Sequence, residues 1–187
     1  MTRTMLSAHL HEVLADVRRL RTRFAQTAPQ AWEPTTAAAE LSVQVGHLAL
    51  CLLRQHGANV SALEDPQRPI TNIGDELADI VLASLSINVL AHSEPAEATP
   101  YPPQVSNEVE AFLRVLVAAG NLSEAALVEH HYRHQPTGTP PSLSEAAAAV
   151  ITACDVLADQ LGLDLVAEFR SMVADADSFL DHRGDAS

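Results

Sequence analysis

Two acidic residues one helical turn apart, Glu76 and Asp79, stand in the otherwise apolar segment IGDELADIVLASLSINVLA, which begins at Ile73. The helical period places both acids on the flank that Ile73 also occupies. A carboxylate in an apolar setting is costly unless it has a partner or binds a cation. Asp75 falls on the other flank, where attraction to the positive helix end accounts for it, and the same dipole effect is the alternative for Glu76 and Asp79.

A second helical segment, AAAELSVQVGHLALCLLRQHG, carries a narrow polar stripe between apolar flanks. The stripe consists of Glu40, Gln44, His47 and Cys51. A solvent-facing side of a helix is normally broader and more charged than this. Glutamate, glutamine, histidine and aspartate can together coordinate a divalent cation, although His47 alone would also suit a hydrogen-bonded structural histidine. We predict that the two segments face each other, with a metal site composed of Glu76, Asp79, His47 and Gln44.

VQVGHLA, from Val43, followed after a spacer by DELADIVL, resembles the signature of the MazG-like all-α nucleotide pyrophosphohydrolases, a superfamily that includes the dimeric dUTPases. In that family one helix reads Glu-Glu-x-x-Glu and a later helix reads Glu-x-x-Asp. These acids bind Mg²⁺, which holds a nucleoside triphosphate and activates water. The second motif is intact as Glu76 and Asp79, whereas the first is eroded, because Val43, Gln44 and His47 stand where glutamates are expected.

The resemblance implies a metal-dependent nucleotide pyrophosphohydrolase that cleaves a nucleoside triphosphate, or a related nucleotide, to the monophosphate and pyrophosphate. Its cofactor would be Mg²⁺ or Mn²⁺, and Glu40 or Glu76 would be the catalytic base. The eroded first motif leaves an alternative, a catalytically inactive MazG-like protein that binds a nucleotide or a protein partner. A helical interaction module in which both polar stripes are packed networks is a third interpretation.

Substrate-binding candidates are few, because the chain contains 11 basic residues, all arginine. Arg54 and Arg133 end two corresponding helices and are predicted to contact phosphate, with solvated surface arginines as the alternative. Arg68 precedes the acidic helix. Trp32, the single tryptophan, occupies a position that resembles the base-stacking aromatic of the family, and it is equally compatible with packing on the core.

The net charge of −13 restricts the partners of the 187-residue chain. Nucleic-acid polymers and anionic membranes both require positive surface, so we expect neither, and expect a small-molecule nucleotide instead. The first residues form an amphipathic pattern without a signal-peptide core, and no stretch approaches an uninterrupted transmembrane span. We therefore predict a cytoplasmic protein. The sequence leaves open whether two chains pair as a homodimer.

Helical periodicity dominates and strand patterns are nearly absent, which predicts an all-α, MazG-like bundle of about six helices. The predicted helices are 4–27, 36–56, 70–92, 105–134, 142–161 and 164–181. Residues 1–93 are predicted to be an N-terminal MazG-like half that carries the site. A proline-rich linker at 94–104 precedes a degenerate C-terminal half, 105–187.

A weak internal repeat supports this division into halves. The segment from Val43 aligns with that from Val117, and the segment from Ile73 aligns with that from Leu143. Under this alignment Glu76 and Asp79 correspond to Ala146 and Ala149. The two halves would then form an intramolecular pseudo-dimer in which one half carries the site and the other covers it.

Overall fold

The computed structural model describes residues 5–97 and 104–184, and this part of the chain is all-α, as predicted. It contains a short 3₁₀ helix, η1, followed by six α-helices and no strand. The elements are η1 (Leu6–His9), α1 (Leu10–Thr27), α2 (Pro34–Gln55), α3 (Ile73–Leu90), α4 (Glu108–Glu129), α5 (Leu143–Leu161) and α6 (Leu165–Gly184).

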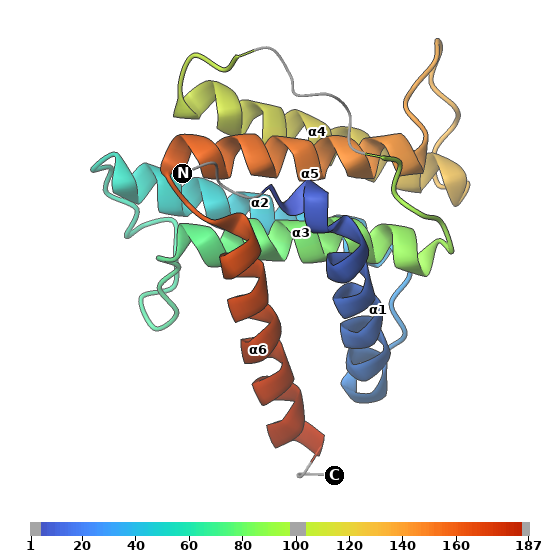
Figure 1. The fold of residues 1–187 in the computed structure, drawn as a ribbon, viewed down its shortest axis with the longest axis horizontal. Coiled ribbons are helices and arrows are strands. Elements are labelled where there is room, and N and C mark those ends of the chain that lie inside the picture. Colours follow the sequence, from blue (N-terminus) through green and yellow to red (C-terminus); the bar gives the residue numbers. More distant parts are fainter. Residues whose placement is uncertain (1–4, 98–103, 185–187) are drawn as a thin grey trace.

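Helices α2 to α5 form a four-helix bundle in which α2 packs on α3, α4 on α5, α2 on α4 and α3 on α5. Figure 1 shows α4 behind α5 and α2 behind α3, so that α2 and α4 form one layer. Helices α1 and α6 cross this bundle and pack on α3. Helix α3 therefore has neighbours on nearly every side, which explains why its sequence is apolar almost all round.

Side-chain caps fix where α3 and α5 begin. The side-chain Oδ1 of Asn72 accepts hydrogen bonds from the backbone amides of Gly74 and Asp75 at the start of α3. Ser142 and Glu145 form a reciprocal capping box at the start of α5. These caps satisfy amides that have no partner within the helix, and they set the register of the acidic turn of α3.

The four bundle helices end in the same way, with a residue in the left-handed conformation just past the helix. In α2 and α4 these residues are Gly57 (φ 78°) and His131 (φ 61°); in α3 and α5 they are His92 (φ 54°) and Gly162 (φ 77°). The next amide bonds to the carbonyl five residues earlier, at 2.9 Å in all four cases. This Schellman geometry ends α4 at Glu129 rather than at the predicted residue 134.

Helices α2 and α4 have the same length, 22 residues, and their bounds differ by a constant 74 positions. The left-handed residues Gly57 and His131 differ by the same 74 positions. Ile73 and Leu143, which begin α3 and α5, differ by 70 positions, as do His92 and Gly162. The two helix pairs therefore correspond residue by residue, in the register that the sequence repeat predicts.

The chain ends are tied to the bundle by acidic side chains. Buried Asp155 of α5 accepts the backbone amides of Leu6, at 2.7 Å, and Ser7, at 3.0 Å, and so holds η1 in place. Arg19 and Arg23 of α1 both pair with Asp177 of α6. Of the predicted linker 94–104, residues 98–103 lie outside the described part of the structure.

One expectation from the sequence needs correction. Helices α2 and α4 are each long and apolar enough to cross a membrane, as judged by length and composition, and the bent pair α5–α6 would qualify as one broken span. The sequence prediction that no stretch approaches a span was wrong by this measure, because each of these helices contains a long apolar stretch with few charged residues. In the fold, only 39% of the most apolar stretch of α2 and 33% of that of α4 is buried.

Candidate functional site

A cavity of about 690 Å³ lies where α1 and α6 cross the α2–α3 pair. Its lining combines acidic, basic and aromatic side chains from four helices and the loops beside them. The lining residues are Arg21, Phe24, Trp32, Glu40, Gln44, Arg68, Asp75, Asp79, Leu82, Ala83, Ser86, Met172, Asp175, Ala176 and Phe179. Such a mixture of apolar walls and converging polar groups is typical of small-molecule sites.

The polar stripe of α2 forms a hydrogen-bonded chain that leads from the cavity to α3. The amide nitrogen of Gln44 donates to Glu40 at 2.8 Å, and its oxygen lies 3.1 Å from Nδ1 of His47. His47 Nδ1 in turn lies 3.3 Å from Oε2 of Glu76. Burial, with a smaller contribution from Arg68, lowers the pKa of His47, so the imidazole is neutral at pH 7. The two predicted segments do face each other.

Of the residues in these contacts, Glu76 is the one with a buried oxygen that lacks a hydrogen bond to the described part of the chain. It is only 7% exposed, and Oε2 is buried without a hydrogen-bond donor among the described residues, since His47 Nδ1 is directed at Gln44. Burial, followed by the negative charges of Asp79 and Asp75, raises the pKa of Glu76 to about 7. A carboxylate kept in such a place without a donor favours either protonation or a cation.

The pKa values of the other two acids at the start of α3, Asp75 and Asp79, are raised as well. Burial, followed by repulsion from Asp75 and Glu40, raises the pKa of Asp79 to about 7. The pKa of Asp75 is raised by burial and then by Asp175, which reaches the same cavity from α6. Several carboxylates in mutual repulsion in one cavity are a common feature of functional sites.

The residues present fit the divalent cation that the resemblance implies. They offer carboxylate oxygens, the donors that Mg²⁺ and Mn²⁺ prefer, and the raised pKa values reflect charge that a cation would neutralise. No group of three or more histidine, cysteine, aspartate or glutamate side chains is already arranged as a ligand set within 5–97 and 104–184. The chemistry therefore suits an ion held by one or two carboxylates together with ligand oxygens.

A basic and aromatic wall faces the acids. The guanidinium of Arg21 lies 4.4 Å from the ring centre of Trp32 and 4.9 Å from that of Phe24. Its Nε is buried and has no hydrogen-bond partner among the described residues, and burial lowers its pKa against the opposing effect of Glu40. Arg68 joins this wall from the loop before α3. Together these side chains give the cavity two cationic groups opposite its carboxylates.

The structure brings some predicted site residues to the cavity and not others. Glu40, Gln44, Asp79 and Trp32 line it, whereas His47 and Glu76 lie directly behind this lining. Trp32 also packs on the hydrophobic core, as one of its two expectations stated, and its contact with a base stays a prediction.

The two arginines predicted to bind substrate point elsewhere. The guanidinium of Arg54 bonds to the carbonyl of Ile70 and to Glu64, and so it fastens the loop that leads to α3. Arg133 lies past the end of α4 and pairs with Glu124 at 2.8 Å. Cys51, which ends the polar stripe, is buried, and burial raises the pKa of its thiol to about 11.

Three charged residues of the cavity were not predicted as site residues, namely Arg21, Asp75 and Asp175, and a fourth, Arg68, was named only as a lesser candidate for phosphate contact. Asp75 and Asp79 are four positions apart and so share a helix face, a signal that the assignment of Asp75 to the helix dipole overlooked. Arg21 and Asp175 lie on α1 and α6, far from the motifs in sequence. Only the crossing of these helices over α3 brings them to the site, and no local pattern indicates that crossing.

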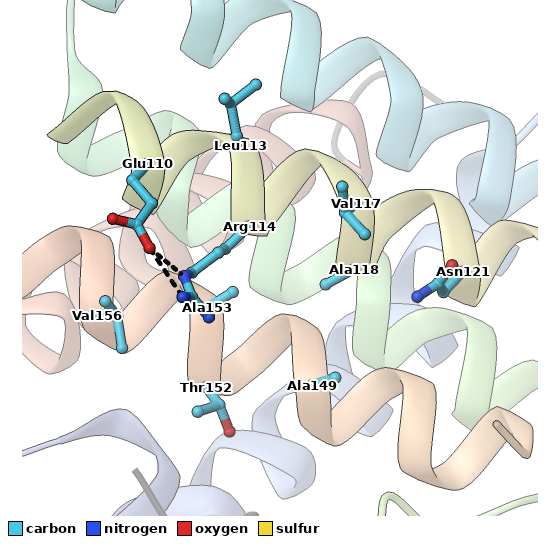
Figure 2. Close-up of a pocket in the computed structure, with 10 residues that line it drawn as sticks. All are labelled: Glu110, Leu113, Arg114, Val117, Ala118, Asn121, Ala149, Thr152, Ala153 and Val156. Carbon is cyan, nitrogen blue, oxygen red and sulfur yellow. Dashed lines mark hydrogen bonds and ion pairs between the residues drawn. The ribbon is translucent and has the colours of Figure 1, made fainter. Parts of the chain in front are cut away.

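A second groove, of about 580 Å³, lies between α4 and α5 at the positions that correspond to the first (Figure 2). Six cavity-lining positions of α2 and α3 have counterparts that line this groove. Those counterparts are Arg114, Ala118, Ala149, Thr152, Ala153 and Val156. Arg114 stands where Glu40 stands and pairs with Glu110 at 2.8 Å, and Ala149 replaces Asp79. At these two positions the second groove lacks the carboxylates of the first, although Glu110 lines it.

No protein-family model, curated protein or solved structure gives a significant match to this chain. The function must therefore be argued from the chemistry of the α2–α3 cavity.

Proposed function

We propose that the chain is a MazG-like nucleotide pyrophosphohydrolase whose site is the α2–α3 cavity. Its substrate would be a nucleoside triphosphate or a related nucleotide, cleaved to the monophosphate and pyrophosphate with Mg²⁺ or Mn²⁺. The observation that carries the proposal is the convergence of carboxylates, cations and an aromatic ring on one cavity. A nucleotide needs all three of these features, because it combines phosphates, a metal ion and an apolar base.

The carboxylates of α3 support the metal-binding part. Asp79 and Glu76 would hold the cation, with Glu40, Gln44 and His47 completing and orienting the site. When bound, the ion would polarise the phosphate and offset its charge. Asp75 and Asp175 bring further oxygen donors that the sequence motif does not include.

The opposite wall supports the phosphate and base contacts. Arg21 has a buried guanidinium nitrogen without a partner in the described residues, and Arg68 lies nearby on a loop. Charge-assisted hydrogen bonds to phosphate would satisfy Arg21. Phe24, Trp32 and Phe179 give the same cavity apolar surface for a nucleobase.

Hydrolysis in this site would need a positioned water and a base. In the reaction, the water oxygen forms a bond to the α-phosphorus, and the bond from that phosphorus to the bridging oxygen breaks. Glu40 lines the cavity and is the side chain best placed to accept the water proton. Gln44 holds Glu40 from one side and is itself fixed by His47, so the chain from Glu40 to Glu76 would orient the base.

We also propose that the α2–α3 and α4–α5 pairs are related halves that form the MazG-like pseudo-dimer. The equal lengths of α2 and α4, the matching left-handed caps and the constant offsets of 74 and 70 positions support a common origin. The second groove has no acid at the positions that correspond to Glu40 and Asp79, which is consistent with a degenerate half.

One observation favours the alternative of a catalytically inactive nucleotide-binding protein. Val43, which stands where the family carries a glutamate, is 47% exposed and is not among the cavity-lining residues. With Gln44 and His47 also uncharged in the eroded motif, the cation would have fewer ligands from α2. Such a protein would bind nucleotide without turnover.

The test is pyrophosphate release from a panel of canonical and modified nucleoside triphosphates, with Mg²⁺ and with Mn²⁺. Wild type is compared with Glu76→Gln, which keeps the volume of the side chain and removes its charge. We expect metal-dependent release from the wild type and a loss in the variant. Nucleotide binding without release, detected by a thermal shift, would support the inactive binding protein. Absence of both would refute a nucleotide site.

A further inference from the structure

The outer face of α2 and α4 is an apolar surface that no other described element covers. Helices α1 and α6 pack on α3, at the opposite side of the bundle (Figure 1). Nine large hydrophobic side chains of the described residues are exposed, and six of them belong to α2 and α4. These six are Val43, Leu53, Val109, Leu113, Leu116 and Val117, with exposures from 43% to 62%. A concentration of exposed apolar side chains on one face is typical of an interaction surface.

The face is also uncharged along both helices. Its exposed positions on α2 lie on one side of the helix: Ala39, Ser42, Val43, Gly46 and Leu53. Those on α4 do the same: Val109, Leu113, Leu116, Val117 and Gly120. This stripe contains no acidic residue, although the chain has 24 of them and a net charge of −13. Solvent-facing helix surfaces normally carry charge, so its exclusion here indicates packing.

The surface has two notches, at Gly46 and Gly120, and a groove. Gly46 and Gly120 occupy corresponding positions, and a Cβ atom added to either would meet no heavy atom within 4 Å. A groove of about 330 Å³ lies between the end of α2 and the start of α4, lined by Leu52, Leu53, Val109 and Phe112 among others. Glu108 and His56, which also line this groove, form a 3.1 Å ion pair where α2 ends and α4 begins. Ridges of valine and leucine next to such hollows suit helix-on-helix packing.

We propose that this face is the interface through which two copies of the chain associate with two-fold symmetry. Two copies carry like charge and repel each other, so they can approach closely only where the surface is uncharged. A two-fold interface must be self-complementary, and this face supplies ridges and hollows on two equal helices. The inference does not depend on the proposed function.

The available area is sufficient for such a dimer. Each helix of 22 residues is roughly 33 Å long, and two helices packed side by side span roughly 18 Å. The face therefore offers on the order of 600 Å² per copy, near the lower end of the range for stable interfaces. A lipid bilayer suits this surface less well, because anionic headgroups would repel a chain of charge −13.

Sedimentation equilibrium of the full chain, over about 1 to 100 µM, tests the proposal. We expect the wild type to show twice the chain mass of 20.0 kDa at the higher concentrations. The double variant Gly46→Glu/Gly120→Glu should shift to the single-chain mass, because it places charges in the notches. Both positions have open space and glutamate forms helix better than glycine, so circular dichroism and the melting temperature should not fall.

Ala15→Glu is the matched control, since it adds the same charge at an exposed helical position of α1, and it should remain dimeric. A wild type that stays at the single-chain mass throughout would overturn the proposal. So would a dimer that the double variant leaves unchanged. A wild type of single-chain mass that floats with phosphatidylcholine vesicles would assign the face to lipid instead.

Discussion

The two grooves of the bundle share a frame and differ in chemistry. At corresponding positions the α2–α3 cavity carries Glu40 and Asp79, whereas the α4–α5 groove carries Arg114 and Ala149. Helices α1 and α6 supply part of the lining of the first, whereas α4 and α5 supply the described lining of the second. Carboxylates are thus found where burial removes water from them, which is the less favourable place for stability. A ligand that neutralises them would offset this cost, as the proposed function requires.

Two buried carboxylates, Glu76 of α3 and Asp155 of α5, also differ, in the hydrogen-bond donors that they have. Asp155 accepts two backbone amides and so has a structural role. Glu76 has an oxygen without a donor in the described residues and a pKa raised to about 7. Burial alone therefore does not identify a functional acid. The absence of structural donors is the more informative property.

The largest expected effect comes from breaking the chemical difference between the grooves. Asp79→Asn should lower kcat/KM for nucleotide hydrolysis by at least about 100-fold, because it removes a charged ligand for the metal. Ala149→Asn makes the corresponding change in the second groove and should leave kcat/KM within about twofold. Equal losses in both variants, measured by pyrophosphate release, would show that the second groove takes part in the reaction.

A smaller effect should follow from removing the structural acid. Asp155→Ala leaves the amides of Leu6 and Ser7 without their acceptor, and we expect a loss of about 2 kcal/mol in the free energy of unfolding. Urea unfolding followed by circular dichroism measures this loss. Glu129→Ala, at an exposed position, serves as the control. If Asp155→Ala were as stable as the control, η1 would not depend on this contact.

Glu76 should behave in the opposite way. Its folded pKa of about 7 lies above the ordinary value of 4.5, so Glu76 destabilises the fold progressively as the pH rises from about 4.5 to about 7. Glu76→Gln should therefore stabilise the metal-free protein at pH 8 by on the order of 1–3 kcal/mol, and have little effect at pH 4. Urea unfolding at both pH values tests this sign. A stabilisation equal at pH 4 and pH 8 would exclude ionisation as its cause.

The smallest effects concern the helix ends that the two halves share. A non-glycine residue in the left-handed region is strained, so His92→Gly and His131→Gly should each stabilise the protein by about 0.5 kcal/mol. Gly57→Ala and Gly162→Ala should each destabilise it by about 1 kcal/mol. Thermal unfolding resolves these differences. The corresponding caps are Gly57 with His131, and His92 with Gly162. If the two substitutions of such a pair change the stability in the same direction, the two caps are not equivalent.

The helices could be predicted because their causes are local. Apolar periodicity indicates all six, and caps such as Asn72 and Ser142 lie at their starts. The end of α4 was misplaced because His131, unlike glycine, gives no sequence signal for the left-handed turn that it makes.

The candidate site could be predicted only in part. Spacing within α2 predicts that Glu40 and Gln44 lie together, and the polar stripe of this helix predicts that they face the acids of α3. The opposite wall depends on α1 and α6, whose packing over α3 is a long-range property, and so Arg21 and Asp175 were missed. Arg54 was assigned to phosphate because it ends the helix, yet the loop carbonyl of Ile70 binds it.

The measurement that tests the account most directly is Mn²⁺ binding, followed by electron paramagnetic resonance, in the presence of a non-hydrolysable nucleoside triphosphate. It does not require that the protein be an active enzyme. We predict that the wild type adds a protein-dependent binding site beyond that of the nucleotide alone, that Asp79→Asn loses it, and that Ala149→Asn keeps it. Binding by the wild type that Asp79→Asn leaves unchanged, or no protein-dependent binding, would contradict a metal-nucleotide site in the α2–α3 cavity.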